Sequence, residues 1–168
     1  MGNSKSRDKG MRAEYQVRDM LREATELEWE RVPGSGGFGA SHGLKGDIYL
    51  PVPTGYMSKW CLEVKHYADE HFNSNIMKTA KTQTQFEKWL VQTERESEEM
   101  NAEPMLIFKK DRGQWFAAVP TSHEFGGMVK AAVHPNVVIN IGTNLREYVV
   151  VEFKAVLAMP NIKEELVK

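Results

Sequence analysis

The sequence predicts an α/β protein with a mixed central β-sheet flanked by helices. Its 168 residues are 41% hydrophobic and 27% charged, which suits one domain with a substantial core. Segments with helical spacing and strand-like segments follow one another as helix, three strands, helix, two strands and a β-rich C-terminal third. No repeat or low-complexity segment interrupts this order. We therefore expect a single domain over residues 1–168.

Residues 8–25 have the apolar spacing of a helix. Apolar side chains recur there at steps of mainly three and four, at Met11, Tyr15, Val17, Met20, Leu21 and Ala24. Residues 1–22 also carry six Lys or Arg against three acidic residues. This excess predicts a basic arm that contacts DNA phosphates, formed by Lys5, Arg7, Lys9 and Arg12.

A loop and a hairpin are expected next. Residues 27–33 resemble a strand, and residues 34–46 contain six glycines among thirteen residues. That loop is either a flexible linker or a phosphate-binding segment, in which Ser35 would donate a hydrogen bond. Residues 47–52 and 59–67 are two strand-like runs joined by a turn, which predicts a β-hairpin.

The hairpin contains the residues that point to chemistry. Glu63 and Lys65 are two apart and so share one face of their strand, and the hairpin would fold Asp47 back beside Glu63. Converging carboxylates repel each other unless a cation lies between them, and Mg²⁺ typically takes one or two carboxylates plus water and phosphate oxygens. Lys65 would then orient or deprotonate a water, as phosphodiester hydrolysis requires.

The rest of the chain is expected to complete the sheet. Residues 73–99 predict a long helix with an apolar side and a polar side, and the polar side carries Lys78, Lys81, Gln85, Lys88 and Gln92. This polar side is either merely solvated or a contact for a DNA backbone. Strands are expected at 105–110, 114–120, 136–142 and 147–157, a short helix at 123–133 and a frayed end at 161–168. Trp115 and Phe116 are expected in the core.

The pair Gly46–Asp47 followed by the run Glu63–Val64–Lys65 resembles the PD-(D/E)XK nuclease core. The N-terminal half is similar to archaeal-type Holliday junction resolvases and their phage relatives. Three further segments carry this narrower resemblance: the helix at 9–21 with its glutamate, the arginine and Ser-Gly-rich loop at 31–39, and the glutamine-bearing helix around 82–90. Gly46 replaces the proline of the motif, and the insertion at 51–59 is long for this hairpin.

The resemblance implies a restriction-endonuclease-like core at about 7–119 and leaves a β-rich extension at 120–168 without a match. It further implies a site in which Asp47, Glu63 and the Val64 carbonyl bind Mg²⁺ (or Mn²⁺), with Glu14 completing the site and Lys65 positioning the water. A glutamine should lie nearby, either Gln83 or Gln85. The implied partners are branched four-way DNA junctions and a second copy of the chain, in the cytoplasm (the host's, if the protein is phage-encoded).

Other interpretations remain open. A Glu-x-Lys pair alone is more often a solvated pair than a site. A less structure-selective repair or restriction nuclease would carry the same residues, and a DNA-binding module without cleavage would use the acids only as surface charge. Cys61 is the single cysteine, which excludes an internal disulfide and a cysteine-based zinc site. No apolar run is long enough to span a bilayer, so no membrane association is expected.

Overall fold

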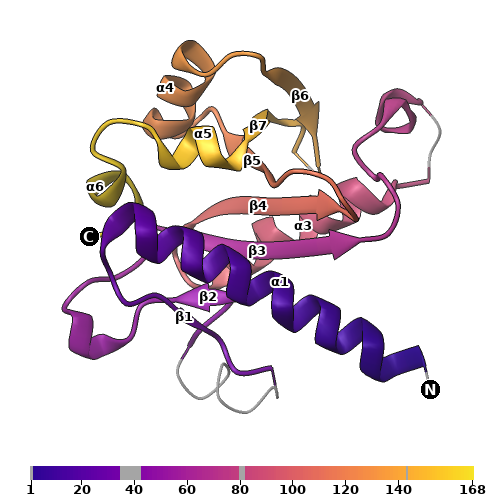
Figure 1. The fold of residues 1–168 in the computed structure, drawn as a ribbon. Helices are drawn as coiled ribbons and strands as arrows, with labels where there is room; N and C mark the ends of the chain where they lie inside the picture. The colour runs from indigo at the N-terminus through magenta and orange to yellow at the C-terminus, as the bar shows by residue number, and fades with distance from the viewer. Residues whose placement is uncertain (1, 35–42, 80–81, 143) are drawn as a thin grey trace.

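A seven-stranded sheet with helices on both faces forms the centre of the computed structural model, which describes residues 2–34, 43–79, 82–142 and 144–168 (Figure 1). The strands are β1 (Glu30–Arg31), β2 (Ile48–Tyr49), β3 (Trp60–Tyr67), β4 (Glu103–Lys110), β5 (Phe116–Pro120), β6 (Val137–Ile141) and β7 (Arg146–Glu152). The helices are α1 (Gly2–Thr25), α3 (Gln85–Glu99), α4 (Glu124–Ala132), α5 (Phe153–Leu157) and α6 (Ile162–Leu166), with short 3-10 turns η1 (Val52–Thr54) and η2 (Ser74–Met77). The predicted α/β class with a mixed sheet is confirmed.

The strand order is β1-β2-β3-β4-β5-β7-β6. Only the central pair β3–β4 is parallel, with Glu63 opposite Leu106, and the other pairs are antiparallel. Parallel neighbours need a crossover, and α3 supplies it. The expected hairpin is present, with Ile48 opposite Leu62.

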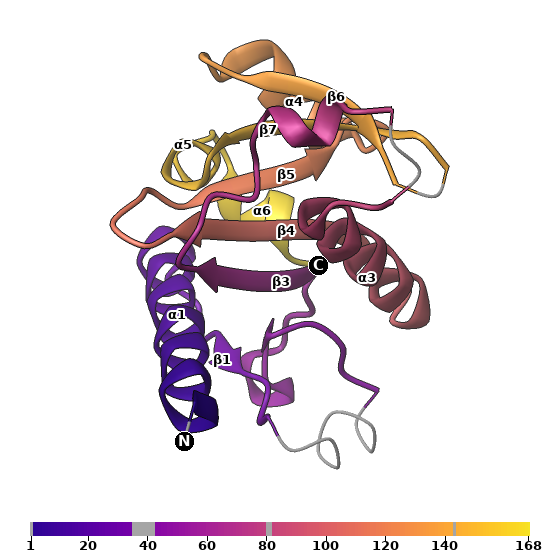
Figure 2. The same ribbon diagram turned by 90° about the vertical axis from the view of Figure 1, so that its right-hand side faces the viewer.

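The two faces of the sheet are covered by different helices. Figure 2 shows α1 on one side of the strands and α3 on the other. On α1, Ala13, Val17 and Leu21 lie at steps of four and are buried in a cluster with alternate β3 residues. On α3, Phe86 and Leu90 are buried against β4 from the opposite face. The central sheet, to which β3 and Glu63 belong, therefore lies between two core layers.

The prediction of one long helix over residues 73–99 is wrong for the first half of that range. Asn73 caps the N-terminus of η2, and Lys78, which follows η2, has extended backbone with φ −68 and ψ 135. A new helix starts where Thr84 accepts a hydrogen bond from the Glu87 N–H, so α3 is shorter than expected. The lysines therefore do not form one helix face: Lys78 precedes the helix, Lys88 lies on it, and Lys81 lies outside the described residues.

The C-terminal third contains more helix than expected. The strand predicted at 147–157 ends at Glu152, and α5 follows it. The end of the chain is not frayed, because Ile162 and Leu166 are buried and the Trp60 indole N–H donates to the Glu165 carbonyl at 3.0 Å. Strands β6 and β7 nevertheless belong to the same sheet as the N-terminal strands.

Smaller differences concern the N-terminal region and one core residue. The basic arm is not a separate tail, since α1 already includes Lys5. The strand expected at 27–33 is reduced to the two residues of β1. Trp115 is buried as expected, whereas Phe116 is 37% exposed. Among the described residues, no helix is long and apolar enough to cross a membrane.

Candidate active site

Asp47 is held at the start of β2 by backbone contacts with β3. Its N–H donates to the Leu62 carbonyl at 2.8 Å, and its Oδ2 accepts from the Val64 N–H at 2.7 Å. Gly46 makes this approach possible, because it has φ +78 and a Cβ there would lie 2.8 Å from the Leu62 carbonyl oxygen. Proline carries a Cβ and its ring fixes φ at a negative value, so it could not adopt this conformation, which explains why the motif's usual proline is absent here.

Glu63 and Lys65 lie side by side on the α3 face of β3. Glu63 is only 4% exposed, and its Oε1 is 3.1 Å from the Lys65 Nζ. Gln92, from α3, joins the pair: its Oε1 accepts from Lys65 at 3.3 Å, and its Nε2 donates to Glu63 at 3.3 Å. The amide of Gln92 therefore bridges the acid and the base.

Glu14 reaches the same place from α1. Its Oε2 accepts a short hydrogen bond from the Arg31 Nε, and both side chains are 18% exposed. The Glu14 carboxyl group also lies close enough to Asp47 for the two to interact electrostatically. Two neighbouring carboxylates repel each other when both are ionised.

Burial and neighbouring negative charges make ionisation of the three acids in the site unfavourable. Burial, and then the charge of Glu14, raises the pKa of Asp47 to about 7. Burial, and then the charge of Asp47, raises the pKa of Glu63 to about 8. The pKa of Glu14 is also raised, chiefly by burial, although Arg31 opposes that shift. The three carboxyl groups therefore keep their protons to higher pH than exposed carboxyl groups do.

Lys65 behaves differently from the acids. Burial alone would lower its pKa, but the adjacent Glu63 carboxylate and Asp47 raise it above its ordinary value. The ammonium group therefore stays charged near neutral pH and serves as a hydrogen-bond donor rather than as a base.

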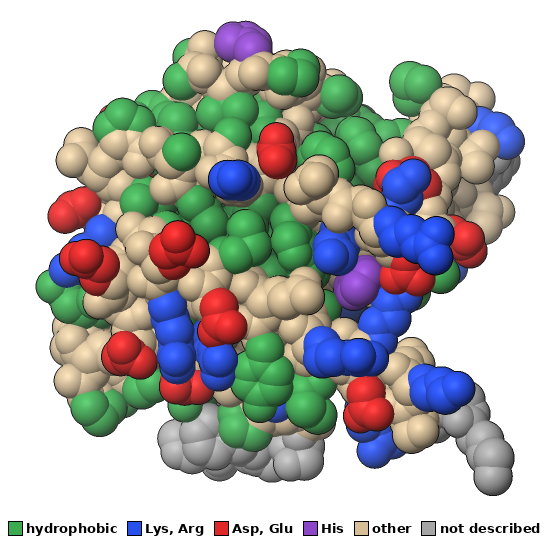
Figure 3. All heavy atoms as spheres, in the orientation of Figure 1, with side chains coloured by type: hydrophobic (Ala, Val, Ile, Leu, Met, Phe, Trp, Pro, Cys, Tyr) green, Lys and Arg blue, Asp and Glu red, His purple; other side chains and the backbone are tan. Residues whose placement is uncertain are grey.

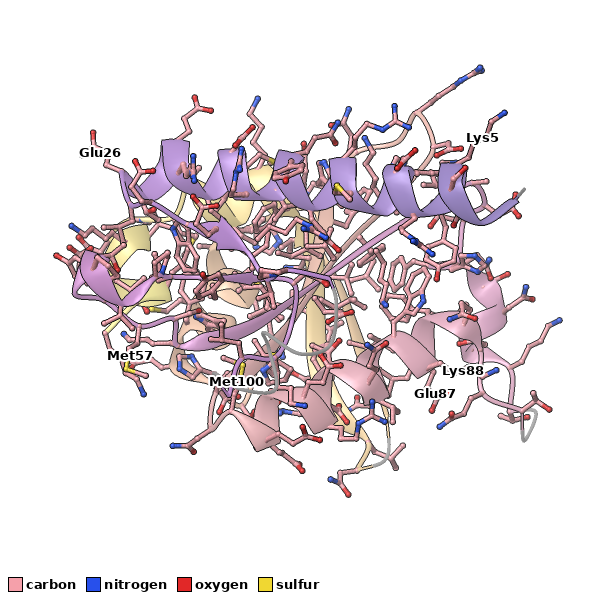
Figure 4. All side chains as sticks on the ribbon, turned by 90° about the horizontal axis from the view of Figure 1, so that it is seen from below. Lys5, Glu26, Met57, Glu87, Lys88 and Met100 are labelled. Carbon is pink, nitrogen blue, oxygen red and sulfur yellow. The ribbon has the colours of Figure 1, made fainter. Side chains whose placement is uncertain are left out.

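A pocket of about 280 Å³ opens at these side chains, between α1 and α3. Glu14, Asp47 and Glu63 line it together with Gln92 and Glu96. Figure 4 views the molecule from the β1–β2 side, with α1 and α3 running along opposite layers. Glu96 accepts from Gln92 at 3.1 Å and from the Gly46 N–H at 3.3 Å, so α3 is tied to the turn that precedes Asp47.

Neither of the two glutamines expected near the site lies there. Gln83 and Gln85 are both exposed, and neither contributes to this pocket. Gln92 lay on the polar side predicted for the helix but was not singled out. Glu96 was missed, and the one signal for it is its position one helical turn after Gln92.

The residues expected to bind DNA are separated from the acids. Lys5, Arg7 and Arg12 are exposed and Lys9 is partly buried, all on the N-terminal half of α1. Lys78, Gln85 and Lys88 are exposed, and Figure 4 shows Lys88 on α3, on the other side of the sheet. Ser35, like Lys81, lies outside the described residues.

With this geometry in place, comparisons with known proteins become informative. A family model described as "Phage putative PDDEXK endonuclease" matches residues 5–167. The chain belongs to this phage PD-(D/E)XK endonuclease family. Protein D14 of Escherichia phage T5 is 61% identical over 117 residues, which are 70% of this chain and 72% of that protein. No solved structure matches the chain. Membership confirms the predicted superfamily and phage context.

PD-(D/E)XK nucleases generally use divalent metal ions, and the donors present fit a hard cation. The pocket supplies carboxylate oxygens, which Mg²⁺ prefers, and burial followed by the charge of a neighbouring carboxylate raises the pKa values of Asp47 and Glu63, a repulsion that a dication would relieve. Within the described ranges, no three His, Cys, Asp or Glu side chains are arranged to hold an ion together. Two carboxylates with water and phosphate oxygens are nevertheless a usual Mg²⁺ environment.

Proposed function

We propose that the protein is a Mg²⁺-dependent, structure-selective DNA endonuclease that resolves four-way junctions. The observation that carries this proposal is the convergence of Asp47, Glu63 and Glu14 in one pocket, with the Lys65 ammonium 3.1 Å from Glu63. Membership in an endonuclease family supports the reaction class. The choice of a branched substrate rests on the resemblance of the N-terminal half to junction resolvases.

Asp47 and Glu63 would hold the metal ion, with the Val64 carbonyl as a further ligand and Glu14 completing the site. Mn²⁺ would substitute for Mg²⁺. When bound, the ion would act as a Lewis acid that activates water and neutralises charge on the phosphate. The Glu14 Oε2 accepts from Arg31, so Oε1 of the same carboxylate would be the atom that takes part.

Lys65 would position the attacking water and the scissile phosphate. A lysine ammonium has three N–H donors. In the described structure two of them are directed at Glu63 and Gln92, at 3.1 and 3.3 Å. The third is left for a water or a phosphate oxygen. Its raised pKa keeps that donor charged, which suits stabilisation of the negative charge that develops on the phosphate.

Junction resolution also requires two coordinated cuts on opposing strands. Each pocket is built from the residues of one chain, so a second copy would not be needed to complete a site. A two-fold symmetric homodimer would instead place two equivalent pockets on the two strands of a junction, whose symmetry is similar. Shape rather than base sequence would then decide the substrate.

The test is cleavage of a fixed four-way junction beside a linear duplex built from the same arm sequences. The wild-type protein with Mg²⁺ should cut the junction in symmetric pairs and the duplex far more slowly, and chelation with EDTA should stop both reactions. Equal cleavage of the two substrates would reject the proposal that the protein resolves junctions. The remaining interpretation would be a less selective repair or restriction nuclease. Binding without cleavage of any DNA would favour a non-catalytic module.

A further inference from the structure

The tip of the β4–β5 hairpin places one acid among many cations. Asp111, at this tip, lies 2.5 Å from the Lys9 Nζ of α1 and 2.9 Å from the His66 Nε2 of β3. Lys5 and Arg12 line two adjacent hollows, and Lys109, Lys110 and Arg112 flank Asp111 in the sequence. Figure 3 shows Lys and Arg side chains gathered over the N-terminal half of α1 and the nearby ends of β3 and β4.

Two hollows meet at this acid. One, of about 500 Å³, runs between α1 and the end of β3 and is lined by Lys5, Lys9, Lys65 and His66 among others. The second, of about 320 Å³, is lined by Lys9, Arg12, His66 and Asp111. They share Lys9 and His66, and the first extends to Lys65 of the candidate active site. The hollows thus form a basic path that ends at the proposed reaction centre.

The contacts of Asp111 are those that a phosphate oxygen would make. Its carboxylate forms an ion pair with the Lys9 ammonium group and lies against the His66 imidazole nitrogen. The His66 Nε2 is buried and makes no aligned hydrogen bond, although Asp111 is near. Asp111 itself is 45% exposed and Lys9 27%, and an ion pair this exposed contributes little to stability. An incoming anion can therefore replace the carboxylate at small cost.

We propose that Lys9 and His66 form a binding subsite for a DNA backbone phosphate, and that Asp111 occupies it until DNA binds. The occupant is a phosphate of the strand that leads to Lys65, because the basic lining of the path complements a polyanion. This inference rests on the proposed DNA cleavage and extends it with a contact away from the reacting phosphate.

The proposed subsite predicts that removal of the Asp111 charge changes DNA binding through Lys9. Asp111→Asn should tighten DNA binding several-fold and steepen the dependence of log K on log salt by about 0.9, since Lys9 then becomes available to a phosphate. Lys9→Ala should weaken binding. In the Lys9→Ala background, Asp111→Asn should no longer tighten it, because the released cation is absent.

A second acid on the same surface provides the matched control. Glu70 is 40% exposed and lies 4.0 Å from Lys110, so Glu70→Gln removes an equivalent charge outside the subsite. Its effect on binding should be smaller and should be the same with or without Lys9. Circular dichroism melting would establish that each variant is folded.

The experiment is fluorescence anisotropy of a labelled four-way junction and a matched duplex in EDTA, where binding is read without cleavage. Tightening by Asp111→Asn that disappears in Lys9→Ala supports the subsite. Unchanged or weaker binding by Asp111→Asn overturns it, as does tightening that persists without Lys9. If wild-type protein binds DNA but only this coupling is missing, the proposed endonuclease stands and the subsite fails. If wild-type protein binds no DNA, both fail.

Discussion

The carboxyl groups of Asp47 and Glu63 destabilise the folded chain whenever both are ionised. Their pKa values are raised to about 7 and about 8, whereas an unfolded chain would ionise them near 4. Between these values the folded state holds protons that the unfolded state has released, so the free energy of unfolding falls as pH rises. The favourable contribution is complete below about pH 4 and is lost as pH passes through 7 and 8.

Asp47→Asn should therefore stabilise the metal-free protein at pH 8. The amide removes the repelling charge and can still accept from Val64, so we expect a gain of about 1 kcal/mol or more, which is roughly 2–4 °C in melting temperature for a chain of this size. The gain should shrink toward pH 4. Calorimetric melting in EDTA across this pH range measures it. A loss of stability at pH 8 would contradict the electrostatic account.

Lys65→Ala should lower the rate of cleavage strongly, by about 100-fold or more, because it removes a positioned donor to the reacting groups. Metal binding should change little, since Lys65 is not a ligand. Single-turnover cleavage and isothermal titration with Mn²⁺ would measure the two effects. If the variant bound metal normally and cut DNA at the wild-type rate, the role assigned to Lys65 would be wrong.

Spacing along the chain was enough to bring Asp47, Glu63 and Lys65 together, because a hairpin and a two-residue period fix which side chains meet. Gln92 could not be chosen in the same way. It is 29 residues from Glu63 and comes from a helix whose rotation against the sheet depends on tertiary packing. The partners of Glu14 likewise became visible only when α1, β1 and β2 were placed together.

The turn before β2 depends on a glycine for two separate reasons. Gly46 has a left-handed φ of +78, and any Cβ would approach the Leu62 carbonyl oxygen to 2.8 Å. Gly55 has a similar φ of +76 but has no atom within 4 Å of its Cβ position. A comparison of alanine variants at the two glycines therefore separates the cost of backbone strain from the cost of a steric clash.

Gly46→Ala should destabilise the protein more than Gly55→Ala, which should cost about 1 kcal/mol from conformation alone. We expect Gly46→Ala to cost about 2–3 kcal/mol and to reduce cleavage, since the turn that carries Asp47 must move. Denaturant unfolding of the two variants, together with a cleavage assay, makes the comparison. Equal costs and unimpaired cleavage in both would show that the close approach at Gly46 is unimportant.

The helix boundary that was mispredicted has a local explanation. Thr84 is followed three residues later by Glu87, which is the pattern of a capping box, and Thr84 does accept from the Glu87 N–H. Periodicity across 73–99 concealed this start signal, because η2 and α3 both present apolar residues to the same core cluster. The C-terminal helices could not be anticipated in this way, since α6 is stabilised by contacts with Trp60, far away in sequence.

At the scale of the whole molecule, the two sets of basic residues lie on opposite faces of the sheet but toward the same end. Figure 4 shows Lys5 on α1 and Lys88 on α3 at one end of the view, on either side of the central strands. A DNA backbone that enters the pocket between α1 and α3 could contact both. The mixed sheet and its flanking helices follow from the sequence pattern, whereas this shared orientation required the fold.

Replacing Lys5 and Lys88 together by alanine should weaken DNA binding and reduce its salt slope by up to about 2, since each lost phosphate contact removes about 0.9. Lys154→Ala is the control, because this exposed lysine of α5 lines a hollow with Met20 and Ala24, at the other end of α1. Binding titrations at several salt concentrations give the slopes. An unchanged slope in the double variant would place the DNA elsewhere.

We also expect the protein to form a homodimer. Light scattering should give twice the mass of the 19.2 kDa chain, both alone and with an uncleaved junction. A monomer that cuts linear duplex as well as junctions would reject resolution by paired sites.

The central claim is that Asp47 and Glu63 carry metal-dependent cleavage of DNA. Its most direct test is single-turnover cleavage of a labelled four-way junction in Mg²⁺ by wild-type, Asp47→Asn and Glu63→Gln proteins, with junction binding measured in parallel without divalent ions. The wild-type protein should cut, and each variant should bind the junction within about 2-fold of wild type yet cut at least about 100-fold more slowly, since it keeps the shape of the site and loses ligand charge. Wild-type cleavage by either variant would contradict the assignment of the active site.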